Sequence, residues 1–216
     1  TLSQELVINV GGKLWGLFGT SGFFLPVAQY TPAVAALFLF QAVFMLAGSI
    51  IPTGALAERW KFGSFVAFTC VMTTLIYPVY ANWVWGGGWL SALGRNYGLG
   101  HGHVDFAGSS VVHMTGGIAA LVTCKLLGPR IGKFDADGTP KPIPGHNIPM
   151  AVLGTYILCF GWFGFNPGST LAATDTRFVL IAVNTMLASG AGGLTETRVA
   201  KLKFCIHDQT WMCNVL

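Results

Sequence analysis

The sequence predicts an all-α protein that crosses a membrane several times, and three observations carry this prediction. Of the 216 residues, 53% are hydrophobic and only 9% are charged, whereas about 25% are charged in a soluble domain. Five apolar stretches are each long enough to cross the ~30 Å hydrocarbon core, which takes roughly 20 helical residues. The Lys and Arg residues alternate in number between successive connections.

The first predicted span runs from Ala33 to Leu56, after a mixed, Gly-rich stretch over residues 1–31 that we expect to be an external loop or a short interfacial segment. The other spans are Phe62 to Trp85, Phe106 to Leu127, Ile148 to Asn166, and Phe178 to Leu194. Together they form one transmembrane domain over residues 32–194. Residues 195–216 form a polar tail, which is either a cytoplasmic terminus or a truncated or non-native end.

The basic residues predict the orientation of the spans. Taken connection by connection, they are Lys13; Arg59 and Lys61; Arg95; Lys125, Arg130, Lys133 and Lys141; Arg177; and Arg198, Lys201 and Lys203. Loops rich in Lys and Arg stay on the cytoplasmic side of a membrane. The N-terminal end is therefore expected outside and the C-terminal end in the cytoplasm, in a multi-pass protein of the cell membrane.

His113 is a candidate pore residue, because ionisable groups inside a span are costly and usually functional. It lies about eight residues into the third span, or ~12 Å deep at ~1.5 Å per residue. Gly116 and Gly117 follow three and four residues later and would clear space beside its ring. The alternative is a histidine that hydrogen-bonds a neighbouring helix for packing.

Asp105 stands where the third helix is expected to begin, so its carboxylate can accept backbone N–H groups at the positive end of the helix dipole. Such a cap is compatible with a second role, since a buried anion near a cation's entrance lowers the local potential. With His101 and His103, Asp105 could also form a metal site. A solvated external loop is the preferred reading of this short cluster, and neither a metal nor a cofactor is expected.

Aromatic residues gather near the ends of the spans. Phe40 and Phe44 lie one turn apart on the first span, Trp85 closes the second, and Trp162 and Phe165 share a face of the fourth. They are either an interfacial aromatic belt or a cage that attracts a small cation by its ring faces, worth ~2 kcal/mol when desolvated. Basic residues are dispersed rather than clustered, which argues against a nucleic-acid partner. The five cysteines are read as inert thiols.

Five runs then resemble, in order and spacing, the signature segments of the ammonium transporter (Amt/MEP/Rhesus) family: GALAERWKF, VWGGGW, DFAGSSVVH, GHNIP and GWFGFNPGS. The resemblance covers roughly residues 40–193, and Ser109 stands where the family pattern has a second Gly. It implies an eleven-helix fold of two inverted halves, of which the five spans would be helices three to seven. It also implies a homotrimer, ammonium or ammonia as substrate, and possible regulation by a cytoplasmic protein.

Residue by residue, the resemblance implies that Phe44, Trp85 and Ser169 recruit ammonium, and that Phe44 and Phe165 form the gate beneath. His113 corresponds to the first of two paired pore histidines, and Asp105 to the carboxylate near the recruitment site. No segment matches the second histidine, since His207 lies in the polar tail, so the chain is expected to be incomplete.

Two alternatives to transport remain. One is a sensor, in which a transporter-like domain reports ammonium to a cytoplasmic signalling module. The other is an intramembrane enzyme using His113 and Asp105, which would need a nucleophile or metal partner that the sequence does not offer.

Overall fold

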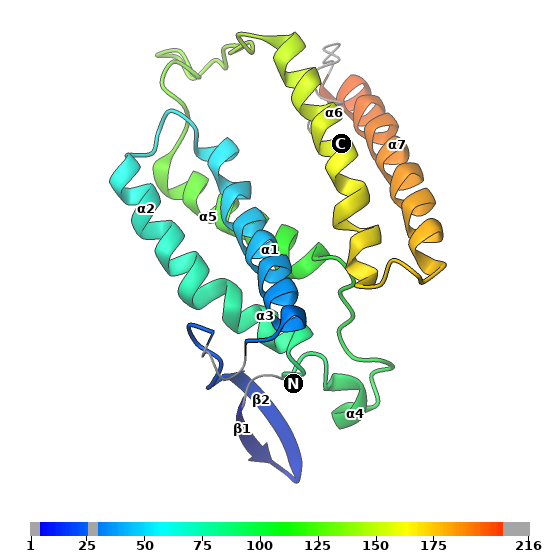
Figure 1. The fold of residues 1–216 in the computed structure, drawn as a ribbon. Helices are drawn as coiled ribbons and strands as arrows, with labels where there is room; N and C mark the ends of the chain where they lie inside the picture. Colours follow the sequence, from blue (N-terminus) through cyan, green and yellow to red (C-terminus); the bar gives the residue numbers. More distant parts are fainter. Residues whose placement is uncertain (1–4, 26–29, 205–216) are drawn as a thin grey trace. The chain divides into compact units, whose positions relative to one another are not determined.

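The computed structural model describes residues 5–25 and 30–204 and contains five helices long and apolar enough to cross a membrane (Figure 1). They are α1 (Pro32–Leu56); the continuous run α2 (Phe62–Val71), η2 (Met72–Ile76) and α3 (Tyr77–Trp85); η3 (Ser109–Met114) with α5 (Thr115–Leu127); α6 (Ile148–Phe165) with η4 (Pro167–Thr170); and α7 (Arg177–Phe204). The predicted all-α polytopic fold is confirmed. The fifth helix continues past Leu194 to Phe204, into the segment read from the sequence as a polar tail.

Local signals explain where the helices begin. Thr31 caps α1 by accepting a hydrogen bond from the Val34 amide at 3.3 Å, and Pro32 occupies the first turn, where no amide hydrogen is needed. Asn147 caps α6 in the same way, through the Met150 amide at 2.9 Å. The third spanning helix starts at Ser109 rather than at Phe106, because Phe106 to Gly108 fold over the Asp105 carboxylate.

The N-terminal stretch, expected to be a loop or an interfacial segment, contains an antiparallel pair of strands, β1 (Glu5–Val10) and β2 (Lys13–Gly19). Gly11 and Gly12 join the strands with φ of 61° and 78°, the left-handed pair that a two-residue hairpin turn requires. The hairpin contacts the end of the second span, where the Trp83 indole N–H donates to the Leu17 carbonyl at 2.6 Å.

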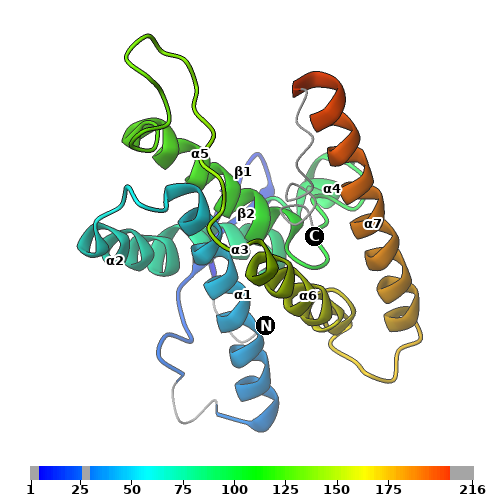
Figure 2. The same ribbon diagram turned by 90° about the horizontal axis from the view of Figure 1, so that it is seen from above.

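The chain forms two compact units, residues 1–141 and 142–216. In the first unit α1 packs against α5 and η3 (Figure 2). Gly116 makes this packing close, since a Cβ there would lie 2.8 Å from the Cβ of Ile51 and 3.0 Å from the Gly48 carbonyl oxygen, both on α1. Small residues of this kind let membrane helices approach each other.

In the second unit α6 and α7 are joined through η4 and run antiparallel. The Asn166 side-chain amide donates to the Thr185 hydroxyl at 3.1 Å, which links the end of α6 to the middle of α7.

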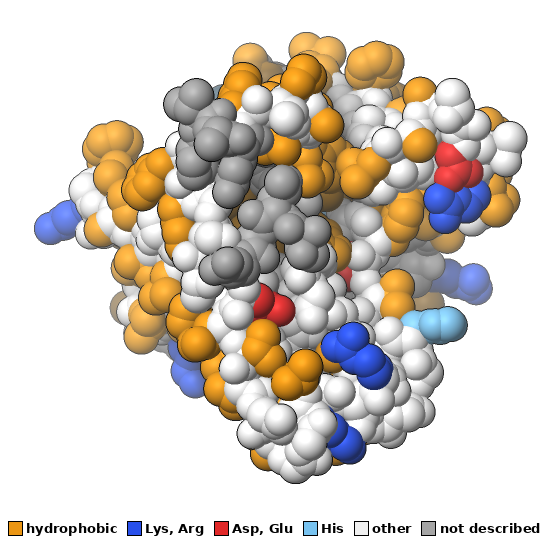
Figure 3. All heavy atoms as spheres, turned by 60° about the horizontal axis from the view of Figure 1, so that its bottom comes forward, with side chains coloured by type: hydrophobic (Ala, Val, Ile, Leu, Met, Phe, Trp, Pro, Cys, Tyr) orange, Lys and Arg blue, Asp and Glu red, His pale blue; other side chains and the backbone are white. Residues whose placement is uncertain are grey.

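Large apolar side chains cover the outside of these helices. Leu126 is 79% exposed and Phe160 is 82% exposed, and Figure 3 shows hydrophobic side chains spread over the visible face with few charged groups between them. Water-soluble proteins rarely expose apolar surface on this scale, whereas a hydrocarbon solvent suits it. The surface is therefore that of a protein embedded in a bilayer.

Candidate functional site

The Asp105 carboxylate organises the start of the third spanning helix. Its Oδ1 accepts from the amides of Gly108 at 2.7 Å and Ser109 at 2.9 Å. Its Oδ2 accepts from the Ser110 amide, the Ser110 hydroxyl and the Val111 amide, each at 2.8 Å. The helix capping that the sequence predicts is thus present, and it satisfies four amides that have no partner inside the helix.

These five hydrogen bonds also set the charge of Asp105. Burial raises its pKa, but the bonds from Val111, Ser110 and Gly108 outweigh burial and hold the pKa of the carboxyl below its usual value. A carboxylate has about four lone-pair sites, and five donors already occupy them. Asp105 is therefore built to hold the helix start rather than to bind a cation directly.

Gly108 makes this arrangement possible. Its φ of 94° lies in the left-handed region, where glycine carries no steric penalty. A Cβ at this position would lie 2.6 Å from Cγ2 of Val112. Any other residue here would be strained by this φ and would crowd Val112.

The structure brings the predicted aromatic residues Phe44 and Trp85 together. Their ring centroids are 6.0 Å apart at 67°, an edge-to-face pair, and Phe40 stacks on Phe44 at 4.4 Å. The Trp85 indole N–H donates to the backbone carbonyl of Asp105 at 2.7 Å. Because that N–H is engaged, what the indole offers a ligand is its ring face.

His113 lies in the π-helical turn η3, a kind of irregularity that often occurs at functional sites. Its Nδ1 is 3.1 Å from the Gly108 carbonyl. A carbonyl can only accept, so Nδ1 of His113 carries a hydrogen and donates it. Gly116, expected to clear space beside this ring, instead meets the Gly48 carbonyl and Ile51, because it faces α1.

Phe165 and Ser169 lie in the second unit. Phe165 stacks on Trp162 with centroids 5.1 Å apart at 14°, and the Ser169 hydroxyl donates to the Phe165 carbonyl at 2.7 Å. The predicted pairs of Phe44 with Phe165 and of Ser169 with Trp85 join residues of different units, and they stay predictions. His207 lies outside the described residues.

Sequence reasoning missed the contact, the burial or the backbone conformation of three residues near the site. His103, expected in a solvated loop, is half-buried, and its Nε2 lies 2.8 Å from the Ser110 hydroxyl. Tyr77 is 3% exposed, and nothing in the sequence marked it. The φ of Gly108 could have been suspected from its place before a helix. Among the described residues, no three His, Cys, Asp or Glu side chains are placed to hold a metal ion.

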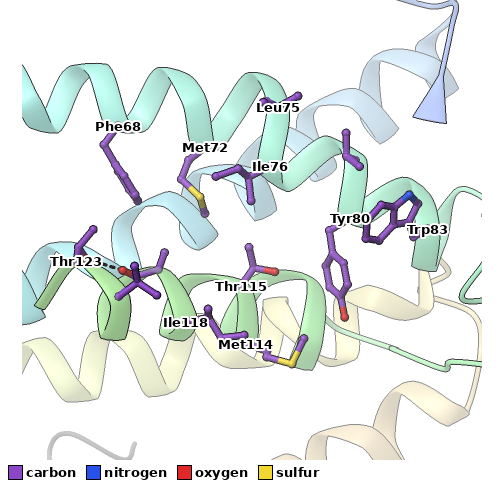
Figure 4. Close-up of a pocket in the computed structure, with 13 residues that line it drawn as sticks. Phe68, Met72, Leu75, Ile76, Tyr80, Trp83, Met114, Thr115, Ile118 and Thr123 are labelled. Carbon is purple, nitrogen blue, oxygen red and sulfur yellow. Dashed lines mark hydrogen bonds between the residues drawn. The ribbon is translucent and has the colours of Figure 1, made fainter. Parts of the chain in front are cut away.

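A separate apolar cleft of about 570 Å³ opens between the second and third spans (Figure 4). Its two threonine hydroxyls bond within their own helix: Thr115 donates to the Ser110 carbonyl and Thr123 to the Ala119 carbonyl. Tyr80 brings a hydroxyl to the wall, and the rest of it is mostly hydrocarbon, including Leu75, Ile76 and Ile118. The cleft therefore suits an acyl chain or another apolar helix.

Comparisons with known proteins converge on one family. The model of the Ammonium Transporter Family matches residues 7–214. The chain is similar to ammonium transporter Amt2 of Archaeoglobus fulgidus, with 46% identity over 209 residues, covering 96% of this chain and 45% of that protein. It is also similar to ammonium transporter 1 member 3 of Solanum lycopersicum, with 47% identity over 189 residues, covering 82% of this chain and 41% of that protein.

A solved structure described as a sensor Amt protein has a TM-score of 0.79 and 33% identity, covering 92% of this chain and 51% of that chain. The chain spans less than half the length of the two curated relatives.

Proposed function

Since this chain belongs to the ammonium transporter family, we propose that it forms part of a pathway that carries ammonium or ammonia across the cell membrane. The observation that supports this most is the placement of Trp85. Its N–H is bound to the Asp105 carbonyl and its ring packs edge-to-face with Phe44. A fixed indole with one aromatic neighbour presents a face for a small cation, an attraction worth ~2 kcal/mol once water is removed.

Ser169 would complete the recruitment site. Its hydroxyl hydrogen is used on the Phe165 carbonyl, so the oxygen presents lone pairs, which suit an ammonium ion that donates hydrogen bonds. Potassium has no hydrogen to donate and would gain less at such a site. Phe44 and Phe165 would then form the gate beneath it.

His113 would line the pathway below the gate. With its Nδ1 hydrogen on the Gly108 carbonyl, His113 in its neutral form would have Nε2 as the nitrogen that can accept from ammonium or take up a proton. A bare cation in hydrocarbon is very costly, so a polar relay of this kind lowers the barrier. Asp105 would support the site by holding the helix and by its negative charge.

The remaining proposals concern assembly and orientation. From the family resemblance and the distribution of Lys and Arg we propose a trimeric assembly, with the N-terminal end of this chain outside and its C-terminal end in the cytoplasm, where a regulatory protein would bind. Arg95→Cys and Lys141→Cys, each made in a variant whose five native cysteines are replaced by serine, test the orientation, because an impermeant thiol reagent should label only the first from outside.

The function is tested by uptake of labelled methylammonium in cells that lack other ammonium uptake and express this protein from its own gene. Trp85→Leu should raise KM several-fold, whereas Trp60→Leu, on the opposite end of the spans, should not. Uptake indistinguishable from that of cells without the protein would refute transport. Potassium uptake as fast as methylammonium uptake would refute the proposed selectivity.

A sensor is the second candidate, because a solved structure similar to this chain is described as a sensor Amt protein. A sensor would bind ammonium without carrying it. Saturable binding by the purified protein together with absent uptake would favour it.

A further inference from the structure

The loop before the third span is tied to the candidate cation site by a chain of hydrogen bonds. His103 Nε2 lies 2.8 Å from the Ser110 hydroxyl oxygen. That oxygen lies 2.8 Å from Oδ2 of Asp105, which also accepts from the Ser110 amide. Ser110 is 8% exposed, so these contacts are shielded from bulk water.

The direction of each bond follows from the chemistry of the groups. Five donors point at the Asp105 carboxylate, and its lowered pKa keeps it ionised, so it accepts from the Ser110 hydroxyl. A serine hydroxyl has one hydrogen and two lone pairs. With its hydrogen on Asp105, it must accept at its other contact, so Nε2 of His103 carries a hydrogen and donates it.

The backbone of His103 is anchored on the segment that follows Trp85. Its amide donates to the Leu90 carbonyl at 3.0 Å. The preceding Gly102, with φ of 78°, packs so closely that a Cβ would lie 2.3 Å from the Ser91 carbonyl oxygen. The backbone of His103 is therefore held in place, and the segment that holds it follows the helix that ends at Trp85.

These contacts form one continuous chain of hydrogen bonds from the Trp85 ring to the segment that follows Trp85. The Trp85 indole donates to the Asp105 carbonyl at 2.7 Å, the Asp105 side chain holds Ser110, Ser110 accepts from His103, and His103 is fixed on Leu90. We propose that His103 is a positioning residue for the Trp85 ring: by donating to Ser110 it keeps the serine hydroxyl on Asp105 and holds the carbonyl that fixes the indole.

This inference rests on the proposed function only for its effect on transport. Without the donor, the loop is released from the helix start and the indole samples more orientations. The loss of one neutral hydrogen bond, ~0.5–1.5 kcal/mol, corresponds to about a two- to tenfold rise in KM for methylammonium. The maximal rate should change less, because His113 is untouched.

The first test uses the wild-type protein in detergent with 15N-labelled imidazole rings, and assigns His103 by its loss in His103→Gln. We expect Nε2 to carry the hydrogen. A neutral ring protonated at Nδ1 alone would overturn the proposal, and this result does not depend on whether the protein transports anything.

The second test compares three variants by methylammonium KM and by the indole N–H resonance of Trp85. His103→Leu removes the donor, His103→Gln restores an N–H donor, and His101→Leu is the matched control, since His101 is exposed in the same loop. His103→Leu should raise KM and move the Trp85 resonance, whereas His103→Gln and His101→Leu should leave both the KM and the Trp85 resonance at their wild-type values.

Equal defects in His103→Leu and His103→Gln would overturn the proposal, because donation would then not be what matters. An unchanged KM and an unchanged Trp85 resonance in His103→Leu would do the same. If His103→Leu does not fold, the glutamine variant and the wild-type imidazole spectrum still decide. If the wild type shows no uptake, the Trp85 resonance alone decides, and only the proposed function has failed.

Discussion

Replacing Asp105 by Asn should loosen the start of the third spanning helix. The amide of Asn keeps one acceptor oxygen, which can serve Gly108 and Ser109. Its NH2 group then faces the amides of Ser110 and Val111, which now meet another donor. A carboxylate can accept hydrogen bonds from all four backbone amides at once, whereas the side chain of Asn cannot.

The magnitude follows from the burial of these two donors. Ser110 is 8% exposed and Val111 is 0% exposed, so water does not readily replace the lost acceptor. A buried donor left without an acceptor costs about 1–3 kcal/mol, and two such donors cost ~2–6 kcal/mol. That exceeds the loss of an ordinary helix cap, ~0.5–2 kcal/mol.

Hydrogen exchange at the Ser110 and Val111 amides is the direct assay, with thermal unfolding in detergent beside it. A cost of ~2 kcal/mol or more corresponds to a fall in protection of roughly 30-fold or more. Asp137→Asn is the matched control, because Asp137 is exposed and its hydrogen bonds go to Thr139 in a loop outside the helices. Unchanged protection in Asp105→Asn would refute the view that the carboxylate holds this helix.

Three further predictions follow from the same geometry. Gly108→Ala should destabilise the protein by ~1–2 kcal/mol or more, since alanine is strained at a φ of 94° and would meet Val112, and a melting temperature equal to that of wild type would contradict this. Gly116→Ala should destabilise by overpacking against Ile51, ~1–3 kcal/mol, whereas Gly117→Ala, with nothing within 4 Å, should stabilise by up to ~1 kcal/mol; two shifts of the same sign in thermal unfolding would rule out this packing. The pKa of Asp105 is lowered in the folded state, so its ionised carboxylate adds to the free energy of unfolding. This stabilisation is present in full above the ordinary carboxyl range, about pH 4, and is lost as pH falls through the lower folded pKa. Unfolding measured against pH should show this loss in acid in the wild type and a flatter profile in Asp105→Asn.

The membrane-spanning helices were predictable from the sequence, because the length of an apolar stretch alone decides whether it can cross a bilayer. The five spans were located in this way, and the capping of the third helix followed from a carboxylate at its start. The helix boundary at Ser109 was not predictable from hydropathy, since Phe106 and Ala107 are as apolar as the helix itself.

Features that depend on backbone angles or on distant contacts were harder to predict. The hairpin at Gly11 and Gly12 carries a turn signal that the Gly-rich composition of the whole stretch obscured. The bond from His103 to Ser110 depends on a loop folding back over seven residues, which no residue pattern encodes. Gly116 was assigned to the His113 ring because spacing was counted on a regular helix, while its actual neighbours lie on α1.

Because of the π-helical turn η3, the residues before it and the residues after it in the third span face their neighbours independently of each other. An α-helix advances each residue by about 100° around its axis, so one residue more or fewer before Gly116 would turn its face away from Gly48. The wider turn absorbs such an offset, letting Asp105 and His113 be set on one side of the turn and the helix contact on the other. One helix can therefore hold Ser110 and Val111 on the Asp105 carboxylate and Gly116 against Gly48, whereas a regular α-helix through residues 109–114 would align only one of these contacts.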